Sequence, residues 1–277
     1  MLCAKEGVTA MTEANLIALL TDFGLKDPYV GIMKGVIAGI NPKASIIDIT
    51  HEIRPQDVLG AALVLASAYP YFPEGSVFCS VVDPGVGGKR RIIALETQSH
   101  RFLAPDNGLL TLVCERERVV ESASVEERRY FLEKISATFH GRDVFAPVAA
   151  HLAQGLDLDK LGARVSEITR LSWPHPQMER NTLTGEIIYI DHFGNAISNM
   201  DAELLKSTFG DDLLKITVDC KGHLIQGLSA YYAQAPPGQP IALIGSAGFL
   251  EIALREGSAE KDLGLRRGSS LTLKKGK

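Results

Sequence analysis

The chain contains few cysteines, and their spacing argues against two kinds of site. The four cysteines, Cys3, Cys79, Cys114 and Cys220, lie far apart and form no CxxC pair. Zinc knuckles and redox dithiols need closely spaced cysteines, so we expect neither. Cys79 lies within an apolar run and Cys114 directly follows one, as is typical of reduced cysteines in cytoplasmic proteins.

Long apolar runs are also missing. No run approaches the roughly 18 residues that a membrane-spanning helix needs, and the N-terminus lacks the apolar core of a signal peptide. We therefore expect a cytoplasmic protein that does not contact a membrane. Residues 1–13 show no periodicity, and Met11 is a candidate start of translation that would make this leader incidental.

Several motifs that would identify a ligand are absent as well. The 29 lysines and arginines are outnumbered by 33 acidic residues, and they are scattered, so nucleic acid is not an expected partner. No GxxxxGK[ST] occurs, and no GxGxxG follows the first expected strand, so nucleotide phosphates are not the expected ligand. Without HExxH or a compact His, Cys and Asp spacing, we expect no metal site.

The chain is long enough for one large domain or two, and its composition favours two. It has 277 residues, of which 45% are hydrophobic, so it can bury a sizeable core. Between Leu161 and Met178 the periodicity stops, and two prolines flank His175. We predict an N-terminal α/β domain over 14–172, a linker over 173–184, and a mostly β C-terminal domain over 185–277.

The N-terminal half alternates between expected strands and helices. Apolar runs at 16–20 and 44–49 predict strands, whereas 27–40 and 57–71 have the spacing of helices. A further strand is expected shortly after the second helix. This alternation is typical of a mainly parallel sheet with helices on its faces.

The most informative stretch is SVVDPGVGGKRR, residues 80–91. An apolar strand ends there on Asp83, a turn rich in glycine follows, and Arg90 comes next. Ligands of open α/β sheets bind at the carboxyl ends of strands, so this acid and this cation are site candidates. The alternative is a surface turn with an ion pair, and the stretch alone does not separate the two.

A second polar cluster, TFHGRD, occupies residues 138–143 before an apolar helix. His140, Arg142 and Asp143 at a helix entrance could bind an anion or orient a nucleophile. The alternative is that Asp143 caps the helix while its neighbours are solvated. Both interpretations stay open at this point.

The C-terminal half consists mostly of short alternating runs separated by turns. These runs predict strands that close into a small barrel or a sandwich. They lie at 185–190, 196–199, 214–218, 223–228, 240–244, 249–253 and 270–273. Two polar clusters, at 191–195 and 245–248, each follow an apolar strand and are further site candidates.

Taken together, the clusters resemble the S-adenosyl-L-methionine hydroxide adenosyltransferases, which are hydrolase relatives of the bacterial fluorinase and chlorinase. The resemblance runs in the family's order from Leu20 to about Ala253. The matching segments are LTDFGLKDPYVGIMKG, DITHEIRPQDV, FPEGSVFCSVVDPGVGGKRR, LAPDNGLLT, TFHGRDVFAPVAAHLA, IDHFGNAISN and IGSAGFLEIA.

The resemblance implies a fold, an assembly and a set of site residues. The fold is an N-terminal α/β domain joined to a C-terminal β-barrel, and the assembly is a homotrimer with active sites between subunits. The implied catalytic residues are Asp83, Arg90 and His140. The implied substrate-binding residues are Asp22, Asp27, Asp191, Asn195 and Ser246. S-adenosyl-L-methionine would be the substrate, with no cofactor and no metal.

The resemblance further implies hydrolysis, in which water or hydroxide attacks ribose C5′ and gives adenosine and methionine. Fluorinase-like enzymes have a tyrosine where Asp83 stands, a Tyr-Ser pair where His140 and Gly141 stand, and a long insertion before Phe102. All three differences favour water over halide. Two alternatives remain: a halogenase that uses S-adenosyl-L-methionine, and a non-enzymatic protein that binds S-adenosyl-L-methionine or adenosine. Binding alone would not need the three catalytic residues.

Overall fold

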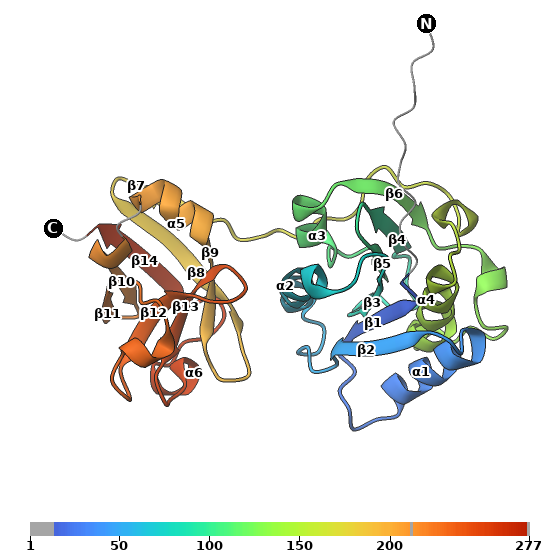
Figure 1. Ribbon diagram of the computed structural model, residues 1–277, viewed down its shortest axis with the longest axis horizontal. Coiled ribbons are helices and arrows are strands. Elements are labelled where there is room, and N and C mark those ends of the chain that lie inside the picture. The colour runs from blue at the N-terminus through green and yellow to red at the C-terminus, as the bar shows by residue number, and fades with distance from the viewer. Residues whose placement is uncertain (1–13, 211–212, 276–277) are drawn as a thin grey trace, which may run out of the picture. The chain divides into compact units, whose positions relative to one another are not determined.

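The structure, a computed structural model, describes residues 14–210 and 213–275 (Figure 1). The chain forms two compact units, the first ending at Leu171 and the second beginning at Ser172. The expectations for residues 1–13 and for Cys3 fall outside the described residues. Cys79, Cys114 and Cys220 are free thiols. In the part of the chain that is described, no helix combines the length and apolar character needed to cross a membrane.

The first unit is built on one six-stranded sheet whose order is β2-β1-β3-β5-β4-β6. β1 pairs in parallel with β2 and β3, and β3 pairs in parallel with β5, whereas β4 runs antiparallel to β5 and β6. The mainly parallel sheet predicted from the alternating pattern is confirmed. The bounds are β1 Leu16–Thr21, β2 Ser45–Thr50, β3 Val77–Val81, β4 Ile92–Thr97, β5 Arg101–Pro105 and β6 Val119–Ser124.

Helices cover both faces of this sheet (Figure 1). Alternate residues of β1 show how: Ile17 and Leu19 belong to the same core as α1 and α4, whereas Ala18 and Leu20 belong to the core that includes α2. Strands buried on both faces read as continuous apolar runs, which is why the sequence pattern showed no alternation there. The helices are α1 Tyr29–Ile40, α2 Val58–Ala68, α3 Thr111–Arg116 and α4 Ala146–Ala153.

The second unit is an eight-stranded antiparallel sheet that is nearly closed into a barrel. Its order is β11-β10-β14-β8-β9-β13-β12, with β7 paired to β8, and a bridge between Ser229 and Leu243 joins the segment after β11 to β12. The barrel prediction is confirmed. The strands are β7 Gln177–Glu179, β8 Thr182–Ile190, β9 Ala196–Asp201, β10 Ile216–Cys220, β11 His223–Gln226, β12 Pro240–Ile244, β13 Phe249–Leu254 and β14 Ser270–Lys275.

Two features of the second unit differ from the sequence prediction. β7 and the start of β8 lie inside the range predicted as a linker, because β7 is exposed at every residue and therefore carries no apolar pattern. The helices α5 Ala202–Phe209 and α6 Ala259–Asp262 were not predicted. α5 does carry sequence signals: the Asp201 side chain accepts a hydrogen bond from the Leu204 amide, and Gly210 follows the helix with φ of 79°. The domain limits given above stay a prediction.

Candidate active site

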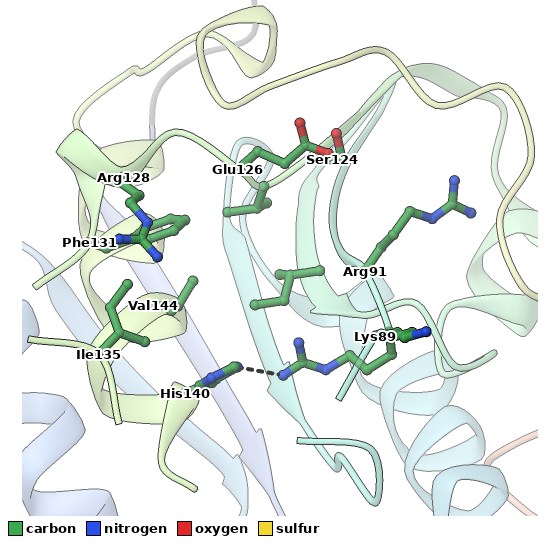
Figure 2. A pocket seen from close by; sticks show the side chains of 12 residues that line it. Lys89, Arg91, Ser124, Glu126, Arg128, Phe131, Ile135, His140 and Val144 are labelled. Atoms are coloured by element: carbon green, nitrogen blue, oxygen red, sulfur yellow. Dashed lines mark hydrogen bonds between the residues drawn. The ribbon is translucent and has the colours of Figure 1, made fainter. Parts of the chain in front are cut away.

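Three side chains predicted from the sequence are bonded to one another in the first unit. Asp83 lies two residues beyond β3, and its Oδ2 accepts hydrogen bonds from Nε of Arg90, at 2.8 Å, and from Nη2 of the same side chain. That Nη2 lies 2.8 Å from Nδ1 of His140, the contact marked by the dashed line in Figure 2. The Asp83 and Arg90 side chains are only 5% and 13% exposed, so this is not the solvated surface ion pair of the alternative interpretation.

The turn after β3 determines how these side chains meet. Gly87 has φ of 75°, a conformation that favours glycine, and a Cβ atom there would collide with the carbonyl oxygen of Ala137. The glycine turn therefore packs directly against the segment that precedes His140. The Gly85 amide donates to Oδ1 of Asp83 at 3.2 Å and fixes the carboxylate against the turn.

The hydrogen bond to Arg90 fixes the tautomer of His140. A guanidinium has only donors, so Nδ1 of His140 must accept, and in the neutral ring the proton lies on Nε2. Burial lowers the pKa of His140, and the positive charge of Arg90 lowers it further, although Asp83 opposes this. The imidazole is therefore neutral near pH 7 and presents an N–H donor.

The other two predicted acids of the first unit lie near the end of β1. Asp22 follows β1 directly, and its Oδ2 accepts a hydrogen bond from the Gln56 amide at 2.8 Å. Burial raises the pKa of Asp22 and the negative charge of Asp83 adds to the rise, although the hydrogen bond from the Gln56 amide opposes it. Thr21 and Val81 are partners in the parallel pair of β1 and β3, so Asp22 and Asp83 follow the same edge of the sheet. Asp27 is exposed before α1 and forms no hydrogen bond or ion pair with another described residue.

Asp143 does not cap a helix, contrary to one interpretation of its cluster. His140 occupies the position before a short π-helix, Gly141–Phe145, and Asp143 lies inside that helix with no exposed surface. Its carboxylate accepts hydrogen bonds from Arg142, at 2.6 Å, and from the Ser136 amide, at 2.8 Å. Asp143 therefore holds the loop that carries His140, and it does so through the backbone amide of Ser136.

A cavity of about 420 Å³ reaches Arg90 and His140 (Figure 2). In Figure 2, Phe131, Ile135 and Val144 form the apolar wall on the same side as His140.

The second unit brings together the remaining predicted residues. Asp191, Asn195 and Ser246 all line one cavity of about 720 Å³. Asp191 organises its own turn, because Oδ1 accepts from the amides of Phe193 and Asn195, and Oδ2 accepts from Nδ2 of Asn195, each at 2.9 Å.

Sequence reasoning missed two polar residues in this cavity, Tyr232 and Glu251. The Tyr232 hydroxyl donates to Oε1 of Glu251 at 2.7 Å. One signal could have found Glu251: it is the single charged residue within the apolar run FLEIAL. In the described part of the chain, no group of three or more His, Cys, Asp or Glu side chains is arranged to hold a metal ion.

Asp143→Asn should destabilise the first unit at neutral pH by about 1–3 kcal/mol, because it weakens charge-assisted hydrogen bonds to a buried group. Burial alone would raise the pKa of Asp143, but the bonds from Arg142 and Ser136 outweigh it and hold the pKa below the ordinary 3.8. The stabilisation is therefore complete above the unfolded-state pKa and is lost as the pH falls toward the lower folded-state value.

Denaturant unfolding of both proteins between pH 7 and pH 3 tests this prediction. The difference between wild type and variant should shrink below about pH 4. Asp159→Asn is a matched control, because Asp159 forms an exposed pair with Lys160 and its loss should leave the midpoint almost unchanged. Equal midpoints for wild type and Asp143→Asn at pH 7 would contradict the assigned role.

Comparison with known proteins gives a consistent result across the chain. Residues 17–162 match the SAM hydroxide adenosyltransferase N-terminal domain, and residues 185–272 match the C-terminal domain of the same family. An (R)-S-adenosyl-L-methionine hydrolase from Thermus thermophilus is 39% identical over 93% of this chain and 98% of its own length. A fluorinase from Nocardia brasiliensis is 31% identical over 96% of this chain and 100% of its own length.

The fold also matches a solved structure. An uncharacterised conserved protein from Thermotoga maritima superposes with a TM-score of 0.87 at 40% identity, covering 94% of this chain and 100% of that one. The two domains of this family occur in the family's order and together match well over half of the chain, which is sufficient to assign the family. The chain belongs to the SAM hydroxide adenosyltransferase family.

Proposed function

We propose that this protein hydrolyses S-adenosyl-L-methionine to adenosine and L-methionine by attack of water or hydroxide on ribose C5′. The observation that carries the proposal is the partly buried, hydrogen-bonded group of Asp83, Arg90 and His140. Family membership and the printed name of the Thermus thermophilus relative support it. The fluorinase has the lower identity to this chain, so a halogenase is the less supported alternative.

The chemistry needs a nucleophile more than it needs an acid. A sulfonium is a cationic leaving group that departs as a neutral thioether, so it requires no proton from the enzyme. Water is a weak nucleophile with a pKa near 15.7. The positive charge of Arg90 beside a water molecule would favour its ionised form, because opposite charges attract strongly in a poorly hydrated site.

The hydrogen bonds assign different tasks to the other two side chains. His140 presents Nε2–H, so it would orient the oxygen of the water by donating to it. Asp83 uses Oδ2 for Arg90, while Oδ1 accepts only the longer bond from Gly85, so Oδ1 has a lone pair left for the proton of the water. Attack of hydroxide on a cationic centre neutralises charge, which a dry site favours.

We assign substrate binding to the acids and polar residues that the resemblance implies, in both units. Carboxylates suit this substrate because they accept hydrogen bonds from ribose hydroxyls and attract ammonium and sulfonium charges. The assigned residues are Asp22, Asp27, Asp191, Asn195 and Ser246. We propose that neither a metal nor a cofactor takes part.

We also propose that the protein is a cytoplasmic homotrimer, as the resemblance implies. Free thiols at Cys79, Cys114 and Cys220 support a reducing compartment. Light scattering across a range of dilutions should give three times the mass of one chain. A fully active monomer at all concentrations would contradict the trimer.

The reaction in heavy-oxygen water should place the label on the 5′ oxygen of adenosine, because attack at C5′ installs an oxygen from solvent. Chromatography with mass detection would identify adenosine and methionine, and activity should survive exhaustive chelation. Free adenine as the product, or activity that is lost with a chelator and restored by zinc, would overturn hydrolysis at C5′ without a metal.

Asp83→Asn, Arg90→Ala and His140→Ala should each lower kcat by at least about 100-fold. Their proposed partner is the water, so affinity for S-adenosyl-L-methionine should stay within about tenfold, or about 1.4 kcal/mol. Lys89→Ala is a matched control, because it removes the neighbouring exposed cation and should leave turnover close to wild type. Large losses of affinity with kcat retained at saturation would reverse these roles.

A further inference from the structure

The segments that follow β1 and β2 are held together at the edge of the sheet that carries Asp22. Thr21 ends β1, and its Oγ1 lies 2.9 Å from Nδ1 of His51, the first residue after β2. The Gly24 amide donates to the carbonyl oxygen of His51 at 2.8 Å, and the Gln56 amide donates to Oδ2 of Asp22. Three hydrogen bonds therefore join the turn that carries Asp22 to the segment that begins at His51.

An irregularity in β2 determines where the His51 side chain points. The pairing of β1 with β2 skips Ile49 between Asp48 and Thr50, so Ile49 is an additional residue in β2. Residues three apart on a regular strand point to opposite faces of the sheet. An additional residue re-aims the side chains that follow it, and Nε2 of His51 accordingly lies 3.1 Å from Oδ1 of Asp48.

Asp48 fixes the direction of the hydrogen bond between His51 and Thr21. Partial burial would raise the pKa of Asp48, but the bonds from Lys34 and His51 outweigh it and lower the pKa, so the carboxylate is ionised near pH 7. An ionised carboxylate only accepts, so the proton of the neutral imidazole lies on Nε2, and Nδ1 accepts from the Thr21 hydroxyl. Oγ1 of Thr21 also accepts from the Phe23 amide at 3.2 Å, so this hydroxyl both donates and accepts within the protein.

An acid, an imidazole and a hydroxyl in this order resemble the catalytic triad of a hydrolase, but burial excludes that role. Thr21 has no exposed surface, and His51 is only 3% exposed, so neither side chain can touch a substrate. Asp22 follows Thr21 directly and is partly exposed. His51 therefore acts on a ligand through the turn that carries Asp22.

Asp22 depends on this connection because its carboxylate is partly buried. Burial disfavours the ionised carboxylate and raises its pKa, whereas the hydrogen bond from the Gln56 amide favours the ionised form. Gln56 belongs to the segment that begins at His51. His51 thus supports Asp22 in two ways, through its bond to Thr21 and through the segment that supplies the Gln56 amide.

We propose that His51 is a positioning residue for substrate binding, which holds the turn at Thr21 so that the Asp22 carboxylate faces the ligand. This inference rests on the proposed function, because it takes S-adenosyl-L-methionine as the substrate and Asp22 as a residue that binds it. Asp22 is assigned to the substrate and not to the attacking water. Loss of the His51 contact should therefore weaken affinity more than it lowers kcat.

Steady-state kinetics of adenosine release test this division. His51→Gln places its amide where Nε2 lies and leaves Thr21 without an acceptor, so KM for S-adenosyl-L-methionine should rise about tenfold while kcat stays within about twofold. His51→Asn places its amide oxygen where Nδ1 lies, so KM should rise less. Thr21→Val should reproduce the effect of His51→Gln, and Thr21→Ser, which keeps the hydroxyl, should have a smaller effect than Thr21→Val.

Two controls separate positioning from general stability. His100→Gln removes another histidine that is 3% exposed, but His100 precedes β5 and so lies at the opposite edge of the same sheet from Asp22. Denaturant unfolding of this variant should show a loss of stability, with KM unchanged. In an Asp22→Ala protein, the addition of His51→Gln should change KM by less than about twofold, because the residue to be positioned is gone.

Unchanged KM in both His51→Gln and Thr21→Val would overturn the inference, as would a fall in kcat with KM retained. An undiminished rise in KM in the Asp22→Ala protein would mean that His51 acts independently of Asp22. Wild-type protein that left S-adenosyl-L-methionine intact would refute the proposed function instead. Calorimetry with the intact compound would then give Kd for the same variants, and a Kd that His51→Gln leaves unchanged, or a lack of binding, would refute the inference as well.

Discussion

The candidate active site depends on the hydrogen bonds that the Arg90 guanidinium donates. Its guanidinium bonds the carboxylate of Asp83 and the imidazole of His140, two groups that otherwise belong to separate parts of the first unit. Removing the guanidinium would leave Asp83 mostly buried without a charged partner, which proteins tolerate poorly. The close packing of Gly87 on Ala137 also holds the turn before Arg90 against the segment before His140.

The two units treat buried charge in opposite ways. In the first, the chain itself supplies the counter-charge, as Arg90 does for Asp83 and Arg142 does for Asp143. In the second, Glu251 receives only a neutral hydroxyl group, from Tyr232.

Sequence alone predicted the sheet, the barrel and the meeting of Asp83 with Arg90, because strand ends and turns leave local patterns. It did not predict α5, although Asp201 and Gly210 mark the ends of this helix. The short alternating runs on both sides of α5 indicated strands throughout this half of the chain. The role of Asp143 depends on the amide of Ser136, and backbone donors have no sequence signature. Glu251 was overlooked because a charge within a strand normally indicates a face exposed to solvent.

The order of the strands in the first unit explains where chemistry can occur. β2 and β3 lie on opposite sides of β1. The helix α1 leads from β1 to β2 and α2 leads from β2 to β3, and the two helices pack on opposite faces of the sheet. Ligands of open α/β sheets bind outside the carboxyl ends of strands where the strand order reverses, as it does at β1. Asp22 and Asp83 follow the neighbouring parallel strands β1 and β3 at that edge of the sheet. Residues at this edge lie on turns beyond the last paired residues of the strands, so one scaffold can accommodate different nucleophiles at the same carbon.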